Sequence, residues 1–134
     1  MSELIDVSNY NQNSILKDYI DKNPDVKVAK LQMCPNYLIT TDGNIYSRTS
    51  DKFLKKQCCK GNGYYEKVIL NIDNGIKRNM RVHRLVAMAF LENPDNLSDV
   101  DHINNNRSDN RIENLRWLSH KDNMNNLKCH NIKL

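Results

Sequence analysis

The stretches VHRLVAMAF (Val82–Phe90) and VDHINNNRSDNRIENLRWLSHKDNMNN (Val100–Asn126) determine how the rest of the sequence is interpreted. In the first, the apolar residues recur with a period of 3.6 and so share one face, which predicts a core helix. Pro94 lies four residues after Phe90, and the helix is expected to end before it. The sequence therefore places a buried helix directly ahead of the second stretch.

The second stretch predicts two short strands followed by a helix. Val100–Ile103 and Asn114–Leu118 are runs with apolar residues on either side of a polar loop, Asn104–Asp109. Ser119 is expected to start the helix, because Asp122 lies three residues later and nearly matches a capping box, with Asp in place of Glu or Gln.

Three polar side chains of this stretch are candidates for chemistry. Asp101 and His102 are adjacent on the first strand, and Asn123 lies on the final helix. If the strands pair and the helix folds back across them, Asp101 and Asn123 converge, and their oxygens suit a hard cation such as Mg²⁺ or Mn²⁺. His102 points to the opposite side of its strand because side chains alternate, and an imidazole titrating near neutrality suits a general base.

These residues resemble the HNH nuclease family, and more closely the HNH homing endonucleases of phages and introns. The resemblance rests on VHRLVAMAF and on the spacing of Asp101-His102, Asn114 and Asn123. Upstream, NYLITTDGNIYS (Asn36–Ser47) looks like the strand-rich module that often precedes HNH in that group. In all, the resemblance covers about residues 27–127.

The resemblance implies a ββα-metal nuclease that hydrolyses DNA phosphodiester bonds. Asp101 and Asn123 would hold one divalent metal, Mg²⁺ or Mn²⁺, and His102 would activate water. Asn114 would hydrogen-bond across the loop between the strands and fix its shape. The products would be a 5′ phosphate and a 3′ hydroxyl. Asn123 stands where many HNH nucleases have His, and Asn is usual in the phage homing branch.

The residues ahead of the core helix predict a short helix and two hairpins. The helix lies within residues 12–22, and one hairpin, Tyr37–Ser47, turns at Asp42-Gly43. The other joins Tyr64–Asn71 to Ile76–Val82. Residues 51–63 between the hairpins are expected to form a basic strand or loop.

The expected fold class is α+β, with a small N-terminal antiparallel sheet, a core helix and then the ββα-metal motif. The expected segments are a helical segment at 1–26, a basic antiparallel-sheet module that contacts DNA at 27–81, the HNH nuclease motif at 82–127 and a tail at 128–134.

Positive charge is concentrated in the middle third of the chain. The whole sequence has 20 Lys+Arg against 16 Asp+Glu, a net charge of +4, whereas residues 52–84 hold nine cationic residues against two acidic ones, Glu66 and Asp73. Such a cluster, with Tyr64 and Tyr65 within it, favours double-stranded DNA as the partner, and a solvated lysine-rich sheet face is the alternative. The DNA-contact candidates are Lys55, Lys56, Lys60, Lys67, Lys77, Arg78, Arg84, Arg107 and Arg111.

Several of these positions also have a structural interpretation. Arg84 could simply be solvated on its helix, and Arg107 and Arg111 in the motif loop are placed next to the expected scissile phosphate. His83, which opens the core helix, is expected to be structural. For Trp117 we expect core packing beneath the site rather than base stacking.

Composition excludes several classes of protein. No apolar run approaches the length of a membrane span, and the N-terminal residues lack the layout of a signal peptide. The four cysteines form no C-x-x-C pair, which argues against a zinc-stabilised adaptor and for free thiols in the cytoplasm, of the host cell if the protein is phage-encoded. An endonuclease is the favoured function, and a non-catalytic DNA-binding module derived from a homing endonuclease is the alternative.

Overall fold

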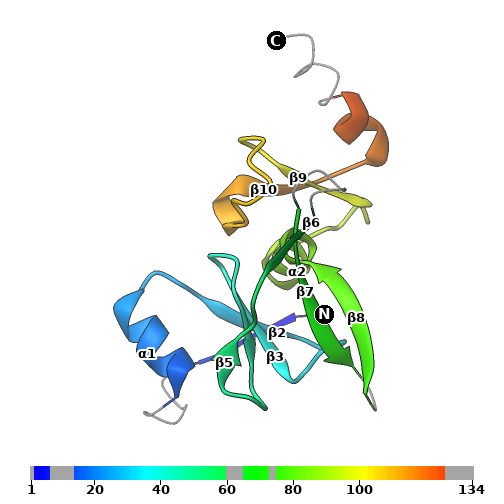
Figure 1. Cartoon of the computed structure of the whole chain (residues 1–134). Coiled ribbons are helices and arrows are strands. Elements are labelled where there is room, and N and C mark those ends of the chain that lie inside the picture. Colours follow the sequence, from blue (N-terminus) through cyan, green and yellow to red (C-terminus); the bar gives the residue numbers. More distant parts are fainter. Residues whose placement is uncertain (1, 7–13, 60–64, 73–74, 126–134) are drawn as a thin grey trace.

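The computed structural model describes residues 2–6, 14–59, 65–72 and 75–125, and the fold is α+β, as predicted (Figure 1). A helix over residues 120–125 follows the last strand. The other helices are α1 (Ile15–Lys22), α2 (Val82–Phe90) and the 3₁₀ turn η3 (Ile112–Asn114). The strands are β1 (Ser2–Leu4), β2 (Val28–Leu31), β3 (Tyr37–Thr40), β4 (Ile45–Ser47), β5 (Lys52–Phe53), β6 (Gln57–Cys59), β7 (Tyr65–Ile72), β8 (Ile76–Arg81), β9 (Asp99–His102) and β10 (Leu115–Leu118).

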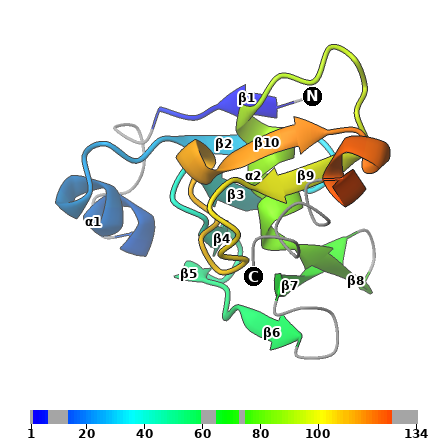
Figure 2. The same cartoon turned by 90° about the horizontal axis from the view of Figure 1, so that it is seen from above.

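The strands form three antiparallel sheets. Strands β1 to β5 pair in sequence order, β6, β7 and β8 form a second sheet, and β9 pairs with β10. In Figure 1, α2 lies between the β9–β10 pair and strands β2 and β3, and in Figure 2, seen from above, the β9–β10 pair lies over α2. A helix surrounded in this way must be apolar on most of its circumference.

The residues of α2 satisfy that requirement. Six of its nine residues are buried, among them Leu85 and Val86, which are fully enclosed. They belong to one hydrophobic cluster that also contains Ile39 of β3, Val68 of β7 and Leu115 of β10. Since full burial of such a side chain stabilises the fold by roughly 1.5–3 kcal/mol, α2 is the element that holds the three sheets together.

Both predicted hairpins are present. In the first, Gly43 adopts a φ of +92°, its N–H donates to Thr40 O at 3.1 Å, and the Thr40 N–H donates to Asn44 O at 2.9 Å. In the second, β7 and β8 pair from Lys67–Arg81 to Ile72–Ile76. Tyr64, predicted as the first residue of this hairpin, and residues 73–74 between its strands lie outside the described part of the chain.

The sheet of the N-terminal module differs from the prediction in two ways. It is divided into two sheets, because β5 pairs with β4 whereas β6 pairs with β7. The segment predicted as helical also contains β1, which pairs with β2. All three residues of β1 are exposed. Its sequence, Ser-Glu-Leu, shows no alternation of apolar and polar positions from which a strand could be predicted.

Helix α1 forms where the spacing of apolar residues placed it. Ser14 caps its N-terminus by accepting a hydrogen bond from the Lys17 N–H at 3.0 Å, and Asn23 follows its last residue. Cys34 and Cys58 are free thiols. Within the described ranges, none of the helices is long and apolar enough to cross a membrane.

Candidate active site

The predicted constellation lies on β9, on the segment that joins β9 to β10 and on the helix that follows β10. Asp101 and His102 are opposite Arg116 and Leu115 in the register. Asn114, at the end of η3, is buried and reaches across the loop: its Oδ1 accepts the Asn104 N–H and its Nδ2 donates to Asp109 O, both at 2.9 Å. The side chain of Asn114 thus connects Asn104 with Asp109 across the loop.

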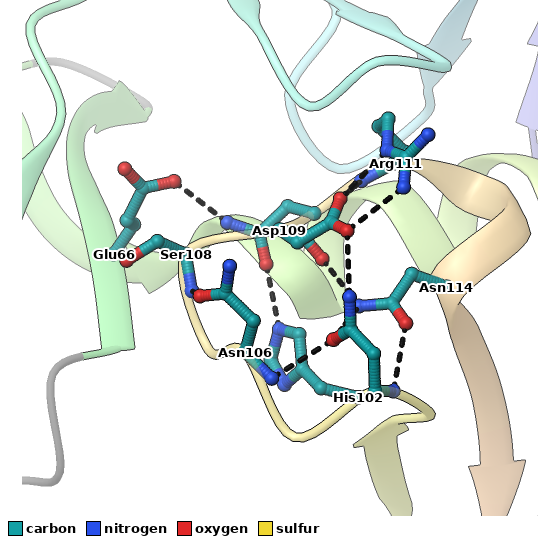
Figure 3. A network of polar contacts seen from close by, with 9 residues as sticks. Glu66, His102, Asn106, Ser108, Asp109, Arg111 and Asn114 are labelled. Atoms are coloured by element: carbon teal, nitrogen blue, oxygen red, sulfur yellow. Dashed lines mark hydrogen bonds and ion pairs between the residues drawn. The ribbon is translucent and has the colours of Figure 1, made fainter.

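The rest of the loop is held by polar contacts that Figure 3 shows together. The Asn106 N–H donates to Asn104 Oδ1 at 2.8 Å, and the Ser108 N–H donates to Asn106 Oδ1 at 3.1 Å. Arg111 forms a two-pronged ion pair with Asp109, with N···O distances of 2.8 and 2.9 Å. The hydrogen bond from Arg111 lowers the pKa of Asp109 to about 2. The guanidinium of Arg111, a predicted phosphate contact, is thus already paired.

His102 lies beneath this loop and is only 4% exposed. Its ring centroid is 4.9 Å from that of His83 and 5.8 Å from that of Tyr65, so two aromatic neighbours fix its orientation. Burial lowers the pKa of His102 below its usual value, although hydrogen bonding to Asn110 and the charge of Asp101 oppose the shift. The imidazole is therefore neutral at neutral pH, which is the state that a general base requires.

A chain of side chains that the sequence did not reveal leads away from His102 (Figure 3). Its Nε2 lies 2.7 Å from Asn110 Oδ1, and Asn110 Nδ2 donates to Glu66 Oε1 at 2.7 Å. Lys56 Nζ is 3.9 Å from the same carboxylate oxygen and donates to Gly43 O at 3.3 Å. Asn110 could not be recognised from the sequence. Its burial and its contacts with His102 and Glu66 mark it as part of the site, and both are properties of the folded chain.

His83 has the structural surroundings that were expected of it. Its ring is 4% exposed and stacks on Tyr65 at 4.9 Å. Burial, reinforced by the neighbouring His102, Arg81 and Arg84, lowers the pKa of His83 to about 3.

The other face of β9 carries the candidate metal ligands. Asp99 and Asp101 share this face because side chains alternate along a strand. Asp101 Oδ2 accepts the Arg116 Nε–H at 2.9 Å. The helix after β10 brings Asn123 to this face, where its Nδ2 donates to Asp99 Oδ2 at 3.1 Å. Asn123 thus contacts Asp99, two residues from the expected partner Asp101.

The chemistry of this donor set fits Mg²⁺ or Mn²⁺. Asp99 accepts a hydrogen bond from Nδ2 of Asn123, which leaves Oδ1 of the same amide as a hard oxygen donor for a cation. The carboxylate of Asp101 is the second donor. Among the residues the structure describes, no cluster of three or more His, Cys, Asp or Glu side chains forms a metal site. A cation here would therefore keep several waters or take substrate oxygens, as Mg²⁺ commonly does.

The strand register divides the predicted DNA-contact residues of the second sheet. Lys67 is opposite Arg81, and Lys77 is opposite Asn71, so Lys67, Lys77 and Arg81 share one face of the β7–β8 hairpin. Arg78 is opposite Leu70, which is buried, and lies on the other face.

Two arginines lie near the ring that borders His102. Arg81 Cζ is 4.7 Å and Arg107 Cζ is 4.9 Å from the centroid of Tyr65. Arg107 was a predicted phosphate contact, whereas Arg81 was not, although it belongs to the basic segment. The basic face of the hairpin therefore continues to the neighbourhood of the imidazole.

The remaining candidates differ in their surroundings. Lys55 is exposed, and Lys60 lies outside the described residues. Arg84 donates to Ser98 O at 2.8 Å and lies 5.7 Å from the centroid of Trp117, so it connects α2 to the segment before β9. Trp117 packs against the core, as expected, and its Nε1–H donates to Leu91 O at 3.3 Å.

Comparison with known proteins identifies the motif. Residues 80–125 match the model of a family described as HNH endonuclease. The chain is 41% identical over 99 residues to an uncharacterized HNH endonuclease of Acanthamoeba polyphaga mimivirus, covering 73% of this chain and 28% of that protein. It is 37% identical over 91 residues to the DNA endonuclease I-HmuI of Bacillus phage SP01, covering 68% of this chain and 51% of that protein.

A solved structure gives the same result for the fold. The structure described as DNA binding and cleavage by the HNH homing endonuclease I-HmuI matches with a TM-score of 0.63 and 34% identity, covering 72% of this chain and 53% of that one. The chain spans about half or less of the length of the curated relatives it matches. The chain therefore contains an HNH endonuclease family domain, homologous to I-HmuI and to the mimivirus HNH endonucleases.

Proposed function

We propose that this chain is a metal-dependent endonuclease that hydrolyses phosphodiester bonds of double-stranded DNA. The observation that supports it most is the placement of His102: a buried, neutral imidazole on one face of β9, with the oxygen donors Asp101 and Asn123 supplied to the other face. A base and a cation site on opposite faces of one strand can act on the attacking and leaving sides of a single phosphate.

Asp101 and Asn123 would hold the cation, Mg²⁺ or Mn²⁺. When bound, it would stabilise negative charge on the scissile phosphate and on the departing 3′ oxygen. Asp99 orients the amide of Asn123 and so acts as a positioning residue. Arg116 donates to one oxygen of Asp101 and limits the directions in which that carboxylate can turn.

His102 would supply the base. A ring nitrogen of the neutral imidazole accepts a proton from water as the water oxygen forms a bond to phosphorus. The bond from phosphorus to the 3′ oxygen breaks, and the leaving oxygen is protonated by solvent, giving a 5′ phosphate and a 3′ hydroxyl. General-base assistance of this kind contributes on the order of 10²–10⁴ to the rate.

The basic face of β7–β8 would bind the DNA backbone. Lys67, Lys77 and Arg81 share this face, and Arg107 approaches Tyr65 from the motif loop. Phosphate contacts of this kind position a duplex without reading its sequence. The solved structure of I-HmuI, which is described as binding and cleaving DNA, supports a DNA partner.

A non-catalytic DNA-binding module is the second candidate. One observation favours it: the groups of the cation face are engaged within the protein, Asp101 with Arg116 and Asn123 with Asp99. If these contacts persist in the presence of metal, the basic face would bind DNA and no bond would be cut.

Conversion of supercoiled plasmid to nicked and linear forms separates the two candidates. The wild-type protein is incubated with Mg²⁺, with Mn²⁺ and with EDTA, beside the His102→Ala variant. The endonuclease predicts cleavage that requires metal and is lost in the variant. Plasmid that is bound but intact with either metal, also when it carries the DNA that surrounds the gene, would support the binding module.

A further inference from the structure

We propose that Glu66 and Asn110 are positioning residues that fix the tautomer of His102, so that Nε2 carries the hydrogen and Nδ1 is left as the proton acceptor. This inference rests on the proposed function insofar as His102 is the base. Glu66 lies on β7, outside the motif residues 80–125, and Asn110 lies within the motif loop.

The chemistry of the chain of contacts determines the direction of each hydrogen bond. An ionised carboxylate only accepts, so the group of Asn110 that lies 2.7 Å from Glu66 Oε1 must be its NH₂. The other end of the same amide, its carbonyl oxygen, then lies 2.7 Å from His102 Nε2. Because a carbonyl oxygen only accepts, Nε2 must donate and therefore carries the hydrogen.

The surroundings hold this orientation in place. Asn110 is 3% exposed, so flipping its amide would leave two buried polar contacts unmade. Lys56 lies 3.9 Å from Glu66 Oε1 and partly balances the carboxylate charge. A Cβ at Gly43 would lie 3.0 Å from Asn110 Cβ, so the turn of the first hairpin packs directly against the stem of this amide.

The two ring nitrogens therefore have different roles in the reaction. When Nδ1 accepts the proton of the attacking water, the ring becomes an imidazolium whose Nε2–H still points at Asn110 Oδ1. With the opposite tautomer, the hydrogen would occupy Nδ1 and the ring could not accept a proton there. Loss of the tautomer should therefore reduce cleavage about tenfold to a hundredfold, a part of what a general base contributes.

Ring nitrogen chemical shifts of ¹⁵N-histidine-labelled protein test this proposal without DNA or metal. Wild-type protein at neutral pH should show a protonated-type shift at Nε2 and an unprotonated-type shift at Nδ1 of His102, with His102→Gln used for assignment. Glu66→Gln, nearly isosteric, allows the Asn110 amide to turn, and Asn110→Leu removes the acceptor. Both should give mixed tautomers.

The same variants are then assayed for plasmid cleavage and for DNA binding in EDTA. Glu66→Gln should reduce cleavage while its dissociation constant for DNA stays within about twofold of wild type, since the alternation of side chains places Glu66 on the face of β7 opposite to Lys67. Glu92→Gln makes the same chemical change at an exposed position and should alter neither measurement.

Each outcome either supports or overturns the proposal. Wild-type shifts that place the hydrogen on Nδ1, or a Glu66→Gln protein with wild-type shifts, would overturn it, and the first of these needs no variant to fold. An inactive wild-type protein with the expected shifts would contradict the proposed function and leave the tautomer assignment supported.

Discussion

At the scale of single residues, His83 is the most unusual group in the core. Its Nδ1 is buried and, within the described residues, has no hydrogen-bond partner. The ring is a neighbour of both Tyr65 and His102, with a centroid distance of 4.9 Å to each. A neutral aromatic ring meets this packing requirement, and a charged one does not.

The titration of His83 predicts how stability depends on pH. The unfolded chain binds a proton at His83 near its ordinary pKa of 6.5, whereas the folded protein does so only near a pKa of about 3. The unfolded state therefore binds more protons between these values, and stability falls by roughly 1.4 kcal/mol for each pH unit below 6.5. This contribution is fully present above that pKa and is lost as the pH falls.

His83→Phe should remove that contribution, because Phe keeps the aromatic packing and cannot be protonated. Urea unfolding at about pH 7 and about pH 5 should show wild type losing some 2 kcal/mol more than the variant. The carboxylates are the same in both proteins, so the difference between the two losses isolates His83. Equal losses would show that His83 is protonated in the folded protein well above a pH of 3.

At the scale of elements, the turn between β3 and β4 connects the N-terminal sheet to the candidate site. Gly43 adopts a φ of +92°, and the Ile112 N–H of η3 donates to Thr41 O of the same turn at 2.8 Å. The virtual Cβ of Gly43 would also lie 3.1 Å from Asn110 O. The turn thus needs glycine for its backbone conformation and for the close approach of the motif loop.

Gly75 provides a matched control, because it has a similar φ of +88° and, among the described residues other than its chain neighbours, no atom within 4 Å of a Cβ built at this position. Gly75→Ala should therefore cost only the left-handed conformation, about 1–2 kcal/mol. Gly43→Ala should cost roughly 1–3 kcal/mol more, since the motif loop must shift away from the new methyl group. Urea unfolding of both variants measures the difference. Equal losses of unfolding free energy in the two variants would mean that the motif loop shifts away from the new methyl group at no measurable energetic cost.

The elements that could be predicted are those whose pattern is local. The Asp42-Gly43 turn and the period of 3.6 in Val82–Phe90 each lie within a few residues, and both elements formed where expected. Strand β1 and the separation of β6 from β5 depend on pairing with distant partners. Strands β1, β5 and β6 are each only two or three residues long, so their sequences carry no local pattern that predicts the partner strand.

The residues of the candidate site also fall into those that local spacing predicts and those that depend on distant contacts. The spacing predicts Asp101, His102 and Asn114 on one strand pair. The structure places Asp101 and His102 on β9, whereas Asn114, predicted to open the second strand, lies in η3 directly before β10. Glu66 is 44 residues away from Asn110, and the contact exists only because β7 and the motif loop pack on α2. Residues that orient a catalytic group through tertiary contacts leave no signal in local spacing.

At the scale of the whole molecule, one core joins the predicted DNA-contacting module to the HNH motif. The cluster around α2 contains residues of all three sheets, so the basic face of β7–β8 is held in a fixed position relative to His102. A duplex bound along Lys67, Lys77 and Arg81 would then extend toward Tyr65 and the imidazole. Position, and not net charge alone, should determine DNA affinity.

Charge reversal at two positions tests this expectation. Lys67→Glu with Lys77→Glu alters the proposed face, whereas Lys22→Glu with Lys27→Glu makes the same change in net charge on and after α1. Lys56 is left unchanged because it contacts Glu66 and Gly43. Binding to a short duplex is measured in EDTA over a series of salt concentrations.

If each reversed lysine contacts one phosphate, the slope of log K against log salt should become shallower by about 0.9 per residue, or about 1.8 for the Lys67 and Lys77 pair. The Lys22 and Lys27 pair should leave the slope close to that of wild type, because its long-range effect is screened within about 10 Å at ordinary salt. The same loss of slope in both double variants would mean that DNA responds to net charge only, and the β7–β8 face would then not be the binding surface.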